Sequence, residues 1–251
     1  MIGPLDDVII VALVPRFVAR CIPSEVLFEG WPGEPSQFFA ESSTSPKIVE
    51  VNIPIPPIPR PDSPTAKGAL AYLSKYAAPW LIAHSHRTFH FGTALLTRTE
   101  IKPDPELLFV AAMLHDLALG TDFDIADTDF QQSSADLAHS YMLETGAIPE
   151  RAQRVHDAIE LHLELKSGND PRPEVAGVHL GALVDVTGLR LNELSTDLVE
   201  QMLHDYPRHG MKTALRAAME SEAHRKPSSR IAALVREVNL LDLITAAPFD
   251  S

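Results

Sequence analysis

Prolines divide this sequence into two parts of different character. Twelve of the 21 prolines lie at or before Pro64, and the densest run extends over residues 54–61. Each proline ring fixes φ and disfavours helix at the preceding residue, so this run must be extended. We therefore expect residues 1–62 to form an irregular, Pro-rich arm that packs on the main domain, formed by residues 63–251. The arm has room for a short strand or helix at 8–14, and a docking site for a proline-binding module is an alternative role.

Beyond the arm, helix signals dominate and no strand-like alternation is present. Ser63 before Pro64, and Asp104 before Pro105, each place an N-cap residue ahead of a first-turn proline. Ser133 opens a capping-box pattern. These signals predict an all-α domain, a helical bundle, whose helices cover about residues 63–75, 79–96, 105–114, 133–146, 149–166, 173–187, 196–206, 209–224 and 228–245.

Composition limits the classes of partner. The chain has 251 residues, a hydrophobic fraction of 45% and a formal net charge of -13, so it can bury a large core but lacks the clustered Lys and Arg that bind nucleic acid. Its single cysteine, Cys21, cannot form an intramolecular disulfide, and no segment has the roughly 20 apolar residues that span a bilayer. We expect a cytoplasmic protein without nucleic-acid or membrane partners.

A His-Asp pair is the main signal of chemistry. His115 and Asp116 follow the apolar run 107–114, whereas the same dipeptide at 156–157 and 204–205 has many charged neighbours. Burying an unpaired carboxylate and an imidazole costs several kcal/mol, roughly, so the first pair needs a partner. A divalent metal such as Zn²⁺, Fe²⁺ or Mn²⁺ is one such partner, and a hydrogen-bond network within the core is the alternative.

Other segments extend this pattern. The chain carries His-Ser-x-Arg-x-aromatic-x-aromatic-Gly at 84–92, Leu-His-Asp-Leu at 114–117, Ala-Ile-x-x-His at 158–162, and an apolar helix that contains Asp185. With these motifs the sequence resembles the HD superfamily of metal-dependent enzymes, and more narrowly its cyanamide hydratase-like branch, over about residues 63–240.

The resemblance implies one divalent metal, Zn²⁺ before Fe²⁺ or Mn²⁺. The implied ligands are His84, His115, Asp116 and Asp185. A metal held by such ligands lowers the pKa of water towards neutrality. Asp116 is thus expected to serve catalysis as well as metal binding.

Two further residues are expected to act beside the metal. We place His162 in a helix over 155–165, where an imidazole suits proton transfer; the alternative is a capped core histidine. Arg87 lies one turn from His84 and is expected to clamp a ligand carboxylate, unless it lies on the surface.

Three features leave the metal count and the specificity open. His139 fits the spacing of a two-metal variant, which would suggest a di-iron oxygenase or a two-metal phosphodiesterase. Gln131-Gln132 stand where the hydratase branch usually has Phe-Glu. The segment Leu117–Phe130 is expected to cover the metal as a lid.

The favoured function is a metal-dependent hydratase or hydrolase that acts on a small neutral substrate, most simply a nitrile such as cyanamide, which would give urea. A phosphohydrolase is the alternative, although Arg87, with Lys166 and Arg190 more remote, offers few cations for phosphate. A di-iron oxygenase and a metal-stabilised binding protein are further alternatives. An arm that wraps a neighbouring subunit would also allow a homo-oligomer.

Overall fold

The computed structural model describes residues 59–97 and 102–249, and that part of the chain is built from helices without a strand. The all-α prediction is therefore confirmed, whereas the short element expected at 8–14 lies outside the described residues. The division between arm and domain stays a prediction. The elements are α5 (Pro64–Tyr76), α6 (Pro79–Leu96), α7 (Pro105–Leu114), α8 (Phe130–Glu144), α9 (Pro149–Glu160), η1 (Ser167–Asn169), α10 (Pro173–Thr187), η2 (Leu191–Glu193), α11 (Thr196–Asp205), α12 (Met211–Arg225), α13 (Arg230–Glu237) and α14 (Leu240–Ala246).

The first helices begin where the prolines and caps predict. The hydroxyl of Ser63 accepts a hydrogen bond from the backbone N–H of Ala66 at 3.1 Å. Asp104 Oδ1 accepts from the N–H groups of Glu106 and Leu107 at 3.0 and 3.2 Å. Each cap satisfies amides that have no partner within the helix.

The expected start of the next helix was wrong. Helix α8 begins at Phe130, three residues before the predicted capping box. The N–H of Ser133 donates to the carbonyl of Asp129 at 3.0 Å, so Ser133 already lies inside the helix. Its buried hydroxyl has no hydrogen-bond partner and caps nothing.

Two predicted helices are too long. Helix α9 ends at Glu160, and the N–H of His162 then donates to the carbonyl of Ile159 at 3.3 Å in a tighter turn. The helix expected over 228–245 is divided into α13 and α14 by Asn239, whose φ of 52° belongs to the left-handed region. Asparagine adopts this region more readily than most residues.

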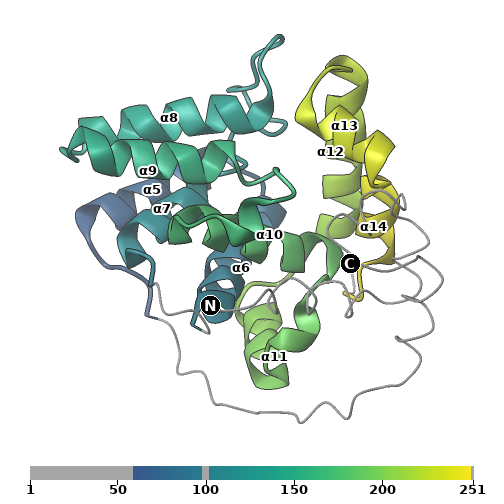
Figure 1. Cartoon of the computed structure of the whole chain (residues 1–251), viewed down its shortest axis with the longest axis horizontal. Helices are drawn as coiled ribbons and strands as arrows, with labels where there is room; N and C mark the ends of the chain where they lie inside the picture. Colours follow the sequence, from purple (N-terminus) through teal and green to yellow (C-terminus); the bar gives the residue numbers. More distant parts are fainter. Residues whose placement is uncertain (1–58, 98–101, 250–251) are drawn as a thin grey trace, which may run out of the picture.

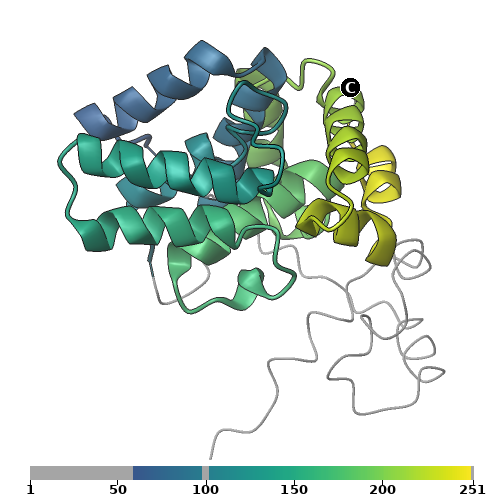
Figure 2. The ribbon, with the colours of Figure 1, turned by 90° about the horizontal axis from the view of Figure 1, so that it is seen from above.

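Helix α7 lies at the centre of the main core. All its residues from Leu107 to Leu114 are buried, and α5, α6, α9, α10 and α8 contact it. A second cluster joins α12, α13 and α14 to Ala118 and Leu119 of the connection after α7 and to Phe130, the first residue of α8. Figures 1 and 2 show these last helices on one side of the molecule and the pair α8 and α9 on the other. The connection between α7 and α8 therefore joins the two clusters.

Helices α6 and α10 make the most extensive contact in the fold. Glycines allow this approach: a Cβ on Gly181 would collide with the carbonyl oxygen of Thr88, and a Cβ on Gly92 would collide with that of Gly177. The two backbones therefore touch directly. This contact sets His84 and Arg87 of α6 opposite Asp185 of α10.

Candidate metal centre

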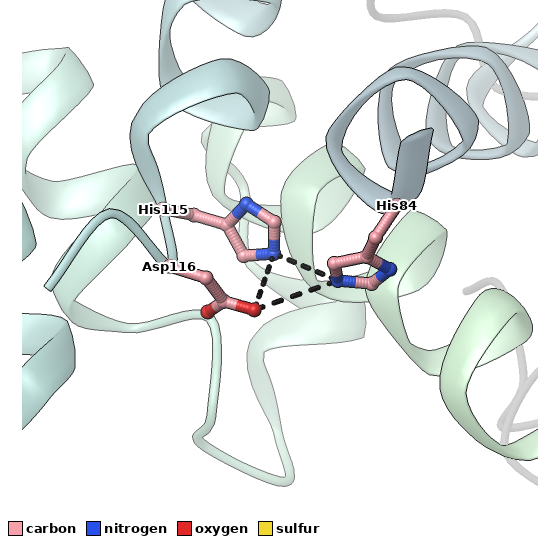
Figure 3. A group of neighbouring side chains, drawn as sticks. All are labelled: His84, His115 and Asp116. Carbon is pink, nitrogen blue, oxygen red and sulfur yellow. Dashed lines mark hydrogen bonds and ion pairs between the residues drawn. The ribbon is translucent and has the colours of Figure 1, made fainter. Parts of the chain in front are cut away.

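Three potential metal ligands meet between α6 and the end of α7 (Figure 3). His84 Nε2 lies 3.2 Å from His115 Nε2 and 3.5 Å from Asp116 Oδ2, and His115 Nε2 lies 3.3 Å from the same oxygen. His84 and His115 are fully buried, and Asp116 is 4% exposed. Two imidazoles and one carboxylate thus face a single point in the interior.

The outer nitrogens of both imidazoles are held by acceptors. Nδ1 of His115 lies 2.8 Å from the carbonyl of Ala112, and Nδ1 of His84 lies 2.7 Å from Asp185 Oδ2. Since these acceptors call for a proton on each Nδ1, the Nε2 lone pairs point inward, which is the tautomer that binds metal. Two lone pairs and an anionic oxygen repel each other at these distances unless a positive charge lies among them, as a proton on Nε2 of His84 or as a metal ion. The donor set therefore fits a divalent metal such as Zn²⁺ or Fe²⁺.

The electrostatics of the site agree with this arrangement. Burial lowers the pKa of His115 to about 3, so its imidazole is neutral. Burial alone would raise the pKa of the Asp116 carboxyl, but the imidazoles of His115, His162 and His84 hold it well below its usual range. Burial opposes a charge on His84, yet hydrogen bonds to Asp116 and Asp185 raise its pKa above the ordinary value. Positive charge is thus favoured beside an ionised Asp116.

Asp185, the fourth expected ligand, falls outside this three-residue group. Its Oδ1 accepts from Nε of Arg87 at 2.7 Å and from Arg208 at 2.8 Å. Its Oδ2 accepts from Arg87 at 2.9 Å and from Nδ1 of His84 at 2.7 Å. Burial opposes its ionisation, but Arg87 and His84 hold the pKa of Asp185 far below its usual range. Asp185 therefore lies behind His84, on the side of the ring that faces away from the group, and its coordination of metal stays a prediction.

Arg87 is fully buried in this contact, not on the surface. It forms two parallel hydrogen bonds to Asp185 and a third, of 2.7 Å, to the carbonyl of Tyr206. Its partner is thus the carboxylate of α10, as the expected clamp requires.

His162 reaches the same centre from the turn after α9. Its Nδ1 lies 2.6 Å from the carbonyl of Ile159, and its Nε2 lies 3.4 Å from Asp116 Oδ1. Asp116 Oδ1 is buried and has no hydrogen-bond partner. The helix expected over 155–165 ends at Glu160, and the turn that follows brings His162 within reach of the carboxylate.

The other expected histidines lie elsewhere. His139 packs edge-on against His156, with ring centroids 6.0 Å apart, and not against the buried group. The second and third His-Asp pairs lie nearer the surface, where side chains of His156 and His204 are 17% and 87% exposed. Context therefore separates the three pairs as the sequence suggested.

Sequence reasoning missed Arg208 and His179. Arg208 contacts Asp185, and Nδ1 of His179 lies 2.8 Å from the carbonyl of His162. Arg208 lies in the connection between α11 and α12, where no periodic pattern marks a buried face. His179 does lie in the apolar helix α10, and that context could have singled it out.

The connection from Leu117 to Asp129 runs from the metal group to α8. It ends close to the site, since the ring centroids of Phe130 and His162 are 6.1 Å apart. Asp124 of this connection is held by Lys226, whose Nζ lies 2.6 Å from Asp124 Oδ1 and 2.7 Å from the carbonyl of Thr128. The expected role of this connection as a lid over the metal stays a prediction.

Comparisons with known proteins agree with the family that the sequence motifs resemble. A model of the HD domain family matches residues 81–247. Cyanamide hydratases DDI2 and DDI3 of Saccharomyces cerevisiae are each 26% identical to the chain over 195 residues, which cover 72% of this chain and 86% of each relative.

Of the helices in the described ranges, none combines the length and the hydropathy that a bilayer crossing needs.

Proposed function

Because the chain belongs to the HD domain family, we propose that it is a hydratase that adds water to a small neutral nitrile, with cyanamide as the first substrate to test. Family and relatives together support the broader class, a metal-dependent hydrolase or hydratase that acts on a small molecule. The observation that carries the proposal is the buried meeting of His84, His115 and Asp116. Beside it, His162 supplies a group suited to proton transfer.

The ligands in this proposal are Nε2 of His84, Nε2 of His115 and Oδ2 of Asp116. A catalytic zinc site commonly has three protein ligands and an open position, and the same donor types also suit Fe²⁺ or Mn²⁺. Asp185 takes a different role here from the ligand role that the resemblance implies. Its four hydrogen bonds occupy both oxygens, so it orients His84.

A divalent cation bound there supplies Lewis acidity, which lowers the pKa of water towards neutrality and polarises a nitrile. The contact with Ile159 assigns the proton of His162 to Nδ1, so Nε2 has a free lone pair. His162 accepts a proton from the water that attacks the nitrile carbon and delivers one to the nitrile nitrogen. Asp116 Oδ1, which accepts no hydrogen bond in the described residues, accepts one from that water or from the substrate amine.

Charge in the site favours a neutral substrate over a phosphate ester. Phosphoryl transfer requires cationic groups directed at the phosphate oxygens. Arg87 and Arg208 already pair with Asp185, and Arg190 pairs with Glu193. The phosphohydrolase alternative therefore has little support from this site.

No contact in the described residues supports a second metal at the buried centre. The di-iron alternative needs extra ligands there, and His139 lies beside His156 instead. The group that His156 forms with Asp157 and Glu160 is partly exposed. Within that group, Asp157 is already bound by Arg172 at 2.6 Å.

The test combines metal content with two activity assays. We expect purified protein to hold one equivalent of metal and to form urea from cyanamide. His115→Ala removes an inner ligand and should abolish both metal retention and urea formation. His204→Ala, which changes an exposed histidine of another His-Asp pair, is the matched control and should leave both unchanged. Release of phosphate from phosphate esters without urea formation would refute the hydratase.

A further inference from the structure

Arg208 lies outside the group of potential metal ligands and is linked to it through buried contacts with Asp185. The side chain is 7% exposed. Nη1 of its guanidinium donates to Asp185 Oδ1 at 2.8 Å, and Nη2 donates to the backbone carbonyl of Asp185 at 3.1 Å. Arg208 therefore holds both the carboxylate and the main chain of the same residue.

The surroundings of Arg208 restrict it to this position. Positive φ angles at His209 and Gly210, of 52° and 74°, turn the chain just after it. The ring of Phe249 lies against the guanidinium, 4.5 Å from its central carbon, and the sulfur of Met211 lies 3.3 Å from one of its nitrogens. Met211 of α12 and Phe249, near the end of the chain, thus pack against the arginine.

Arg208 completes the set of hydrogen bonds that the Asp185 carboxylate accepts. An ionised carboxylate offers about four acceptor sites. Arg87 occupies two of them and Arg208 a third, which leaves Oδ2 also directed at Nδ1 of His84. With three of its contacts fixed by arginines, the carboxylate has little freedom to rotate away from His84.

We propose that Arg208 is a positioning residue of the metal centre: it fixes Asp185 against Nδ1 of His84 and thereby aims Nε2 of His84 at the metal. This inference rests on the proposed metal site. Partners of a metal-binding histidine that lie outside the ligand shell set its tautomer and ring orientation, and their loss typically costs about 10–100-fold in metal affinity.

Stability alone is a poor reason for this arrangement. Two arginines face one carboxylate in the interior, and Arg208 Nε is buried without a hydrogen-bond partner. Burying charges costs energy that a well-packed apolar side chain does not incur. An arginine at this position is therefore better explained by its effect on Asp185 and His84.

The test measures metal affinity, with catalysis set aside. Co²⁺ is titrated into metal-free protein against a competing chelator, and its visible absorption spectrum is recorded for wild type, Arg208→Met, Arg208→Lys and Arg216→Met. Arg216 is the matched control, because it pairs with Glu220 on the surface of α12. Thermal unfolding of each metal-free protein separates loss of affinity from loss of the fold.

We expect Arg208→Met to weaken Co²⁺ binding by about 10–100-fold without unfolding the protein. Arg208→Lys keeps the charge but cannot reach both the carboxylate and the carbonyl, so its affinity should be intermediate. Arg216→Met should bind as wild type does. A folded Arg208→Met that binds Co²⁺ with unchanged affinity overturns the proposal, and if that variant fails to fold, unchanged affinity in Arg208→Lys does so. His115→Ala is titrated as a further variant, and its loss of Co²⁺ binding shows that the metal site itself stands, so the two proposals fail separately.

Discussion

Asp185→Asn is the substitution that probes the charge arrangement behind the metal group most directly. The amide keeps the shape of the carboxylate but removes its charge, while Arg87 and Arg208 remain buried at 0% and 7% exposure. The amide nitrogen that replaces one carboxylate oxygen can only donate, so it meets arginine or histidine N–H groups that need an acceptor. The variant therefore leaves two guanidinium groups without a counter-charge and disturbs the partner of His84.

The structure sets the expected magnitude. Removing one partner of a buried ion pair costs about 3–5 kcal/mol, and Asp185 serves two arginines at 2.7–2.9 Å. For a domain of this size, 1 kcal/mol shifts Tm by roughly 2–4 °C. We therefore expect Tm to fall by about 6–20 °C, a large part of the stability of a typical domain.

The assay is thermal and denaturant unfolding of metal-free protein, which keeps metal binding out of the comparison. Asp205→Asn is the control, since the Asp205 side chain is 42% exposed and pairs with the neighbouring His204, which is itself exposed. It should unfold within about 0.5 kcal/mol of wild type. If Asp185→Asn is equally mild, Asp185 does not neutralise the two arginines and the reasoning fails.

Three further results are expected. Gly181→Ala places a Cβ against the Thr88 carbonyl, so α6 and α10 should separate. We expect a loss of about 1–3 kcal/mol in unfolding free energy and weaker Co²⁺ binding. Unchanged stability together with unchanged Co²⁺ binding would contradict the direct contact of the two helix backbones. His90 has a pKa lowered to about 4, chiefly by burial, so between about pH 6.5 and that value the unfolded state binds more protons than the folded state, and the unfolding free energy falls as pH falls. His90→Phe should reduce the slope of unfolding free energy against pH by up to about 1.4 kcal/mol per pH unit, measured as denaturant unfolding at pH 4.5–6.5. An unaltered slope would show that His90 does not titrate this way. Lys226→Met removes the buried contacts to Asp124 and to the carbonyl of Thr128 and leaves Asp124 only the half-exposed Arg225. Residues 120–129 should therefore be cleaved severalfold faster in limited proteolysis, and equal cleavage rates would show that Lys226 does not restrain them.

The helices could be predicted well where their signals are local. Ser63 and Asp104 cap their helices because each side chain reaches amides within one turn. Proline at the first helical position also acts through neighbouring residues alone. The same reasoning failed at Ser133, because the start of α8 depends on contacts that lie beyond the local pattern. Asp129 there binds the N–H of Arg230 at 2.8 Å, a residue distant in sequence.

The candidate site could be predicted in part. The pattern of histidine and aspartate residues singled out His84, His115 and Asp116, which the fold brings together. It also singled out His162, although the expected helix there is a turn. The place of Asp185 behind His84 could not be read from spacing, because spacing shows which face of a helix a residue lies on but not which of two imidazole nitrogens it meets.

By itself, the sequence determined the helical class, the approximate helix boundaries and the residue types able to bind a metal, since these depend on proline, capping and apolar periodicity within a few residues. Only the tertiary structure decided which ends of those side chains meet. Direct contact between α6 and α10 at Gly92 and Gly181 sets His84 and Arg87 opposite Asp185. The connection after α11 brings in Arg208 from a segment without a periodic signal. Such contacts arise from the packing of whole helices, and no local pattern contains that information.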